Sequence, residues 1–213
     1  IGVEGKDETR VFAKNVVLAT GSRPRQFPGV PFDEERILSN EGALNLKSVP
    51  STLGIIGAGV IGAFCARELM KYRVSVVMLE AADDVAAGAS RANSGIVHAG
   101  FDAPTGSAKA RFNLEGNAIM EQACRELGVS FRRNGSLVLA SKDELPILEE
   151  LLARGRANGV QLLEIIGRDR LLELEPNVSD RADFALFAPS GGIVCPYELT
   201  IAAVGNAMDN GAQ

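Results

Sequence analysis

Three glycines and one glutamate form the clearest chemical pattern in this chain. Gly57, Gly59 and Gly62 fit the spacing G-x-G-x-x-G within the segment GAGVIG. In this pattern the first glycine permits a tight turn, the second lets the backbone approach a pyrophosphate, and the third lets a helix pack against a strand. Glu80 follows after about 20 residues, where a carboxylate can accept hydrogen bonds from both adenosine ribose hydroxyls. Its charge would repel a 2′-phosphate, so the pattern predicts a dinucleotide site that disfavours NADP.

The residues around the glycines predict the strand, turn, helix and strand that such a site needs. Residues 53–56 are apolar and predict a strand, and residues 60–72 follow with helical spacing. The predicted buried face of this helix carries Ile61, Phe64, Cys65 and Leu69. The apolar run over 74–79 predicts a parallel strand that is covered on both sides. NAD and FAD both use this device, so the fingerprint by itself leaves both cofactors open.

Composition and charge argue against several other kinds of site. The chain of 213 residues has a formal net charge of -5 and no run of Lys and Arg, so nucleic acid is not an expected partner. No apolar segment is long enough to cross a bilayer, and no signal peptide is visible. The three cysteines are odd in number and far apart, which predicts a reducing, cytoplasmic location. With a single histidine, no metal site is expected.

The remaining sequence predicts further elements on both sides of the fingerprint. Residues 1–19 predict a hairpin, and residues 22–50 predict a linker punctuated by prolines. Helices are expected over 108–127, 143–158, 168–176 and 197–211. Strands are expected in LLEII, FALFAP and GGIVCP, and FRRNGSLVLA predicts two short strands about an Asn-Gly turn. Cys195 and Tyr197, beside the start of the last helix, are expected to pack in the core.

These elements divide the chain into four expected parts. They are a hairpin and linker over 1–50, a dinucleotide-binding βαβ unit with a cofactor turn over 51–107, an α+β portion over 108–190, and a strand and helix over 191–213 that return to the dinucleotide-binding domain. The chain begins at Ile1 without a methionine and ends just after a predicted helix, so we expect it to be a fragment.

The sequence upstream of the fingerprint resembles one flavoprotein family. Residues 10–62 contain AKNVVLATGSRPRQFPGVPFDEERILSNEGALNLKSVPSTLGIIGAGVIG and resemble dihydrolipoamide dehydrogenase and its disulfide-reductase relatives. This resemblance implies that the fingerprint holds NAD. The redox-active cysteine pair of that family is absent, because the three cysteines of this chain are widely spaced, so lipoamide chemistry is rejected.

The sequence downstream of the fingerprint resembles a different family. The stretches GAGVIGAFCARELMKYRVSVVMLEAADDVAAGASRANSGIVHAGFD, NGSLVLA and LFAPSGGIVCPYELT resemble FAD-dependent oxidoreductases that include D-amino-acid oxidase, glycerol-3-phosphate dehydrogenase and L-2-hydroxyglutarate oxidase. The glycerol-3-phosphate-dehydrogenase-like branch matches best. The resemblance, over residues 57–213, implies a Rossmann-like FAD/NAD(P)-binding domain of the α/β class with an inserted α+β substrate domain, which we expect to be truncated. With the upstream resemblance, it predicts a chimeric chain.

A turn of small and polar residues, SRANSG at residues 90–95, is expected to run beneath the pyrophosphate and flavin by this resemblance. Small residues let backbone N–H groups approach phosphate and ring oxygens, and serine hydroxyls add donors. A solvated loop is the alternative interpretation. The predicted cofactor-binding residues are Gly57, Ala58, Gly59, Ile61, Gly62, Glu80, Ser90, Asn93, Ser94 and Gly95.

His98 is the candidate catalytic residue. It follows the small-residue turn, in the context VHAG, and is expected to lie beside the flavin. Some relatives attach flavin covalently through a histidine in a similar context, HAAG. The alternatives are an acid or base on the substrate side and a hydrogen-bonded structural histidine. Lys109, Arg111, Arg132 and Arg133 are candidates either for receiving an anionic substrate or for solvated surface charge.

The resulting hypothesis is an FAD-dependent oxidoreductase that oxidises a small anionic 2-hydroxy acid or polyol phosphate by hydride transfer to the flavin. The electron acceptor is expected to be quinone, oxygen or another redox protein. Two alternatives stay open: a non-catalytic dinucleotide-binding fragment, and an NAD-binding part of a disulfide reductase. A fragment need not turn over substrate, so the pattern leaves open whether this chain is by itself an enzyme.

Overall fold

The computed structural model describes residues 29, 31–38 and 52–213. The chain divides into two units, 1–49 and 50–213. In the first unit, Asp33 Oδ1 accepts hydrogen bonds from the backbone N–H groups of three residues that follow it closely: Glu35, Arg36 and Ile37. These bonds, with that of Ile37 foremost, hold the pKa of the Asp33 carboxyl below its ordinary value. The predicted hairpin over 1–19 lies outside the described residues.

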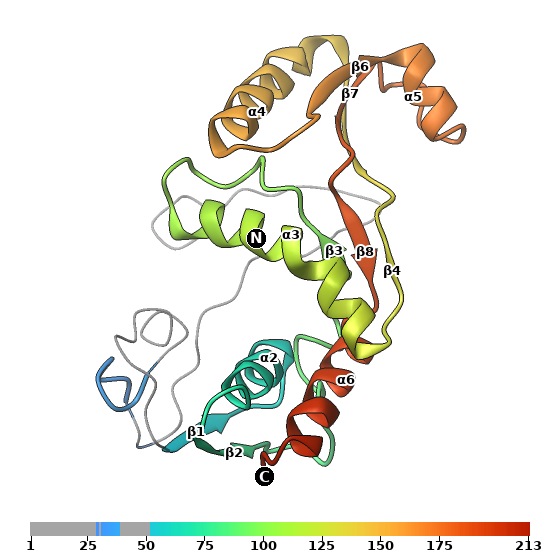
Figure 1. Ribbon diagram of the computed structural model, residues 1–213. Helices are drawn as coiled ribbons and strands as arrows, with labels where there is room; N and C mark the ends of the chain where they lie inside the picture. The colour runs from blue at the N-terminus through green and yellow to red at the C-terminus, as the bar shows by residue number, and fades with distance from the viewer. Residues whose placement is uncertain (1–28, 30, 39–51) are drawn as a thin grey trace. The chain divides into compact units, whose positions relative to one another are not determined.

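The second unit begins with the predicted strand, helix and strand. Their bounds are β1 (Thr52–Ile56), α2 (Val60–Leu69) and β2 (Ser75–Leu79). The two strands pair in parallel, with Gly54 opposite Val77, which confirms the βαβ unit (Figure 1). On the other edge of β2, the backbone of Gln213 donates to Val76 O at 3.0 Å and accepts from Met78 N–H at 2.7 Å.

A second helix, α6 (Pro196–Asp209), packs against α2, and Figure 1 shows the two side by side. The buried residues of this contact are small: Ala63 and Ala66 on α2, Ala203 and Ala207 on α6. Alanines let the two backbones approach closely. The predicted buried face of α2 is therefore wrong in part, because Ile61 is 67% exposed and Cys65 is also exposed.

Strand β2 is covered on one face only by the described part of the chain. Val76 is buried beside α2 and α6, whereas Val77 and Leu79 are 39% and 60% exposed. The expected coverage on both sides is therefore not present within residues 52–213.

The rest of the second unit contains two antiparallel sheets together with further helices. The first has the order β3-β8-β4 and consists of β3 (Ile96–Val97), β8 (Gly192–Val194) and β4 (Phe131–Arg132). The second has the order β5-β7-β6 and consists of β5 (Ser136–Ala140), β7 (Phe184–Ala188) and β6 (Glu164–Gly167). The strand predictions for β6, β7 and β8 are confirmed.

The two short strands expected about the Asn-Gly turn are present as β4 and β5, but they do not pair with each other as a hairpin. Strand β4 pairs with β8, and β5 pairs with β7, so the chain passes from one sheet to the other without reversing. Figure 1 shows the segment that joins β4 to β5 running beside the segment that joins β7 to β8, between the two sheets. Gly135 has a positive φ of 75°, but the chain makes no turn there, because each flanking strand pairs with a strand elsewhere in the sequence.

The predicted helices are confirmed by α3 (Ala108–Leu127), α4 (Leu145–Asn158, preceded by the 3₁₀ turn Lys142–Glu144), α5 (Arg168–Leu174) and α6. Ser107 Oγ accepts the Ala110 N–H at the start of α3, and left-handed glycines end two of the helices: Gly128 after α3 and Gly159 after α4. The largest core cluster, around Leu148, Leu163 and Leu186, lies between α4 and the second sheet.

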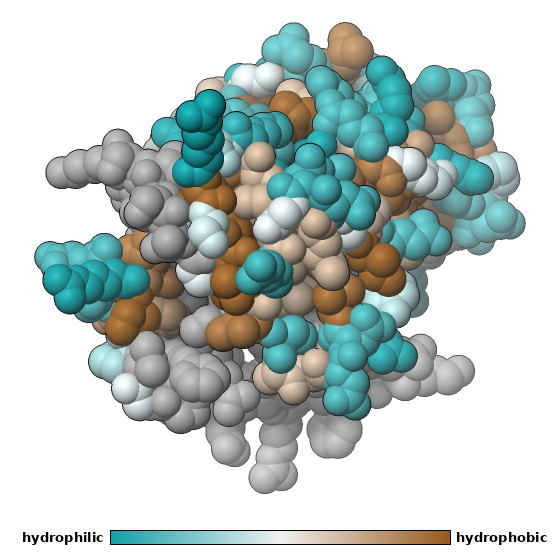
Figure 2. Space-filling view, turned by 60° about the horizontal axis from the view of Figure 1, so that its bottom comes forward, coloured by the Kyte–Doolittle hydropathy of each residue, from teal (hydrophilic) through white to brown (hydrophobic). Residues whose placement is uncertain are grey.

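Within residues 29, 31–38 and 52–213 there is no helix with the length and hydropathy needed to span a membrane. On the face displayed in Figure 2, apolar side chains lie in short runs between hydrophilic ones. Several large apolar side chains are nevertheless strongly exposed, among them Leu162 at 80% and Ile119 at 62%.

Candidate dinucleotide site

The glycine fingerprint forms a tight connection between β1 and α2. Gly57 has φ +103°, a conformation that side chains rarely adopt, and its N–H donates to Leu79 O at 2.7 Å. A Cβ on Gly62 would lie 2.2 Å from Gly57 O and 3.1 Å from Ile55 Cγ2. The third glycine is therefore needed for α2 to start directly beneath the turn.

Glu80 lies against this turn. Its Oε2 accepts the Ala58 N–H at 2.6 Å, and its Oε1 accepts the N–H groups of Ala81 and Ala82 at 2.8 and 3.1 Å. Because these bonds favour the ionised form, with that of Ala58 foremost, the pKa of the Glu80 carboxyl is lowered. The fingerprint thus has an ionised carboxylate beside it, as the sequence pattern predicts.

The small-residue turn is brought to the same place. Ser90 Oγ accepts the N–H of Val60, the first residue of α2, at 2.9 Å. A Cβ on Gly59 would lie 3.2 Å from the same Ser90 Oγ, so a side chain at the second glycine would crowd the small-residue turn. The small-residue turn therefore lies against the start of α2, and its predicted contact with the pyrophosphate and flavin stays a prediction.

The turn is held in shape at its far end. Asn93 Oδ1 accepts the Gly95 N–H at 2.8 Å, while Ser94 is exposed. Gly95 has φ +71°, and a Cβ there would lie 2.1 Å from Val194 O. Of the other predicted residues, Ala58 is buried and Ile61 is exposed on the first turn of α2.

The N-terminus of α2 retains hydrogen-bonding capacity. Gly59, its N-cap, has no side chain, and the first turn carries no acidic residue. Four N–H groups at a helix start lack partners in the helix itself, and here Ser90 satisfies that of Val60. Free N–H groups with the positive end of the helix dipole suit an anion such as a pyrophosphate.

His98 is exposed at the end of β3, and its backbone oxygen accepts a hydrogen bond from Asn117 Nδ2 at 2.9 Å. Its imidazole has no hydrogen bond among the described residues. Burial raises the pKa of the nearby Asp102 carboxyl, but the hydrogen bond and charge of Lys109, with a smaller influence of His98, outweigh it and leave the pKa lowered.

The basic candidates Lys109 and Arg111 form ion pairs with residues outside the fingerprint. Lys109 pairs with Asp102 at 3.2 Å, and Arg111 pairs with Glu115 at 3.6 Å on the surface of α3. Arg132 is exposed. These geometries favour the surface-charge interpretation for all three.

Arg133 and Asn117 form a polar cluster that the sequence patterns did not indicate. Arg133 Nη1 donates to Asn117 Oδ1 at 2.9 Å, and Asn117 is 8% exposed in the middle of α3. A polar residue among the apolar positions of an amphipathic helix is the one signal that could have singled out Asn117.

The core packing expected for Cys195 and Tyr197 is wrong. Cys195 is exposed as the N-cap of α6, and Tyr197 is 37% exposed with its hydroxyl 3.5 Å from Asp84 Oδ2. The start of α6 faces solvent, while its buried face begins at Leu199. Over the described ranges, no group of three or more His, Cys, Asp or Glu side chains could hold a metal ion.

The model for the FAD dependent oxidoreductase family matches residues 52–213. The chain belongs to this family. The glycerol 3-phosphate dehydrogenase of Caloramator mitchellensis is 48% identical over 160 residues, 75% of this chain and 33% of that protein. The mitochondrial L-2-hydroxyglutarate dehydrogenase of Nematostella vectensis is 32% identical over 145 residues, 67% of this chain and 31% of that protein. The chain therefore spans about a third of the length of these relatives.

Solved structures agree with the family. The FAD-bound L-alpha-glycerophosphate oxidase from Mycoplasma pneumoniae superposes with a TM-score of 0.72 at 28% identity, over 76% of this chain and 43% of that chain. Glycine oxidase from Geobacillus kaustophilus gives 0.70 at 27% identity, over 76% and 45%. The predicted fold class and the downstream resemblance are confirmed, and FAD is the cofactor that the family uses. The upstream resemblance over residues 10–62 stays a prediction.

Proposed function

We propose that the fingerprint and the small-residue turn together hold FAD. The first turn of α2 would receive the pyrophosphate, and Glu80 would accept the adenosine ribose hydroxyls. The observation that carries this proposal is the hydrogen bond from Val60 N–H to Ser90 Oγ, because it joins the two turns at the start of one helix. N–H donors at the helix start and the carboxylate acceptor of Glu80 together fit an adenosine diphosphate.

Bound FAD would supply the hydride acceptor for oxidation of a C–H bond next to an oxygen. The chain's own residues would do the rest of the work. Residues 90–95 would place N–H and hydroxyl donors against the cofactor, and His98, which follows them, is the proposed acid or base on the substrate side. No other ionisable side chain of the described residues is assigned to proton transfer.

The proposed substrate is a small anionic 2-hydroxy acid or polyol phosphate. Support comes from the names of the relatives, glycerol 3-phosphate dehydrogenase and L-2-hydroxyglutarate dehydrogenase. The electron acceptor is proposed to be quinone, oxygen or a redox protein. A reducing, cytoplasmic location is proposed because none of the three cysteines forms a disulfide.

A non-catalytic role is the second candidate, favoured by the coverage of only 33% of the glycerol 3-phosphate dehydrogenase. The test is anaerobic mixing of the FAD-loaded chain with glycerol 3-phosphate or L-2-hydroxyglutarate, followed at about 450 nm, the usual flavin band. Bleaching with one substrate supports the oxidoreductase. A bound flavin that neither substrate bleaches supports the non-catalytic role and rejects turnover by this chain.

A further inference from the structure

Asn117, on α3, joins two backbone segments that are far apart in sequence. Its Nδ2 donates to His98 O and to Ser190 O, both at 2.9 Å. Its Oδ1 accepts from Arg133 Nη1 at 2.9 Å. The amide is therefore satisfied at both ends, as a side chain only 8% exposed requires.

Arg133 completes the cluster. Besides Asn117 Oδ1, its Nη1 donates to Ser190 O and its Nη2 donates to Asn117 O at 3.3 Å. Its Nε lies 3.9 Å from a Glu121 carboxylate oxygen, and the guanidinium lies 5.2 Å from the Phe131 ring centre. With these partners the guanidinium is committed within the fold, which argues against its receiving an anionic substrate.

The cluster lies at the sheet crossing, the place between the two antiparallel sheets where residues 133–135 and 189–191 run side by side. The crossing is crowded: Gly135 N–H donates to Gly191 O at 3.0 Å, and a Cβ on Gly191 would lie 2.9 Å from Ser136 Oγ. A Cβ on Gly192 would lie 2.8 Å from Arg132 O. This backbone has little room to shift, so a side chain anchored to it is a fixed point.

His98 follows the turn proposed to hold FAD after the two residues of β3. The Asn117 side-chain amide donates both to the His98 carbonyl and to the carbonyl of Ser190, and so links His98 to the sheet crossing. The hydroxyl of Ser190, whose carbonyl Asn117 also contacts, is buried without a hydrogen-bond partner among the described residues.

We propose that Asn117 and Arg133 are positioning residues that fix the backbone of His98, and with it the end of the cofactor turn, against the sheet crossing. This proposal rests on the proposed function, because it assigns the fixed segment to FAD. Residues 96–97 are also held by the pairing of β3 with β8, so without Asn117 and Arg133 it is residues 98–99 that would sample several conformations. If about a tenth of the molecules then keep the binding conformation, FAD affinity falls about tenfold.

The test uses Asn117→Asp, Arg133→Gln and Arg133→Lys. Asn117→Asp keeps an acceptor for Arg133 but turns an oxygen toward the carbonyls of His98 and Ser190. Arg133→Lys keeps the charge with fewer directed donors, so it should rescue in part. Arg132→Gln is the matched control, because Arg132 is the exposed neighbour and has no ion pair within the described part of the chain.

Two readouts separate this proposal from the function on which it rests. Hydrogen exchange of the FAD-free chain reports residues 95–101 directly, and we expect faster exchange there in Asn117→Asp and Arg133→Gln than in the control. FAD titration should show about tenfold weaker binding. The absorbance band of the bound flavin should also shift, which a variant that is merely less stable would not produce.

Wild-type exchange rates at residues 95–101 in both variants overturn the proposal, whether or not the chain binds FAD. Faster exchange with FAD affinity and band position as in the control also overturns it, since the pair would then fix a backbone that the cofactor does not use. A wild-type chain that takes up no FAD rejects the proposed function, and with it the cofactor part of this proposal. Exchange in that chain still decides whether the pair positions His98.

Discussion

Gly62 is the fingerprint residue at which the fold leaves least room for a side chain. A Cβ would lie 2.2 Å from the carbonyl oxygen of Gly57, whereas a Cβ on Gly205, within α6, would meet nothing within 4 Å. We expect Gly62→Ala to lower the free energy of unfolding by about 1–3 kcal/mol, the usual cost of overpacking. Gly205→Ala, the control, should hold or raise it. Urea unfolding measures both, and equal stability of the two variants would contradict the turn geometry.

Glu80 should leave a signature in acid. Its pKa is lowered from an ordinary value of 4.5, mainly by the N–H of Ala58, so the ionised form stabilises the fold above pH 4.5. That contribution is lost as the pH falls through the lowered pKa. Glu80→Gln should therefore be less stable than wild type at pH 7 and lose less stability on acidification. Urea midpoints at pH 7 and pH 3 test this, and parallel pH profiles would show that the hydrogen bonds do not form.

At the scale of elements, the contact between α2 and α6 depends on alanines. Ala203 is completely buried beside Ala63, whereas Ala118 is exposed on α3. We expect Ala203→Leu to destabilise the chain by about 1–3 kcal/mol because the larger side chain forces the helices apart. Ala118→Leu should change stability little. Thermal unfolding distinguishes them, and an equally stable Ala203→Leu would mean that the helices are not in close contact.

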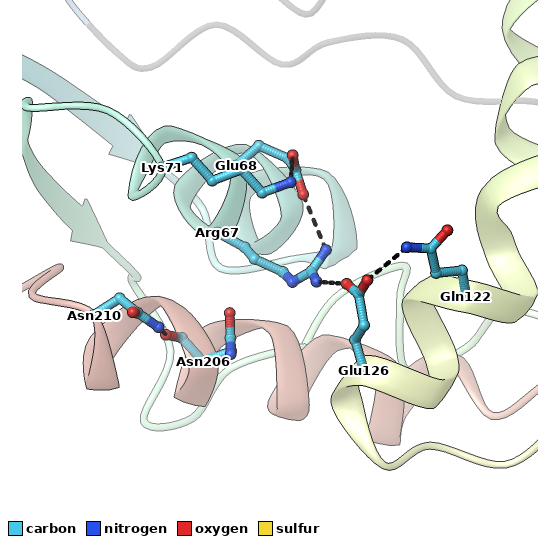
Figure 3. Close-up of polar contacts among 7 residues, drawn as sticks. All are labelled: Arg67, Glu68, Lys71, Gln122, Glu126, Asn206 and Asn210. Atoms are coloured by element: carbon cyan, nitrogen blue, oxygen red, sulfur yellow. Dashed lines mark hydrogen bonds and ion pairs between the residues drawn. The ribbon is translucent and has the colours of Figure 1, made fainter.

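Figure 3 shows the ion pair that joins α2 to α3. Arg67, whose side chain is 10% exposed, donates to Glu126, and Glu126 also accepts from Gln122 at 2.8 Å. The Gln122 hydrogen bond and Arg67 together lower the pKa of the Glu126 carboxyl. Removing the Glu126 charge would leave the nearly buried Arg67 guanidinium with the more exposed Glu68 as its remaining ion-pair partner among the described residues.

Glu126→Gln should therefore lower the melting temperature more than Glu115→Gln, which breaks the exposed pair with Arg111. The difference should shrink in high salt. Equal melting temperatures for both variants at low salt would show that the pair between α2 and α3 contributes nothing.

The helices could be predicted because residues at their own ends mark where they begin and end. Ser107, Gly128 and Gly159 cap α3 and α4 as their types suggest, and Pro196 opens α6. Strand pairing could not be predicted in this way. The partners of β4 and β5 lie more than 40 residues further along the chain, and an Asn-Gly pair can also stand in a connection that does not reverse the chain.

The site residues differ in the same way: those that serve one short turn could be predicted, and those that depend on packing between elements could not. The glycine spacing and Glu80 could be predicted because each is required by the geometry of one short turn. The Asn117 and Arg133 cluster could not, because it depends on how α3 meets the sheet crossing. The buried face of α2 was misread for a related reason: a close helix contact prefers alanine to the larger Ile61 and Cys65.

At the scale of the whole molecule, the chain carries the family's match over residues 52–213 yet spans about a third of its relatives. Binding of FAD and turnover of a substrate are thus separate questions. The described residues bring together both turns proposed to contact FAD, whereas the substrate assignment draws only on the relatives' names.

The most direct test is titration of the purified chain with FAD, NAD and NADP, followed by calorimetry. We predict saturable binding of one FAD per chain, weaker binding of NAD, and none of NADP, whose 2′-phosphate would meet the ionised Glu80. Glu80→Gln should weaken FAD binding. A folded chain that binds no FAD, or that binds NAD more tightly than FAD, would contradict the assignment of this site.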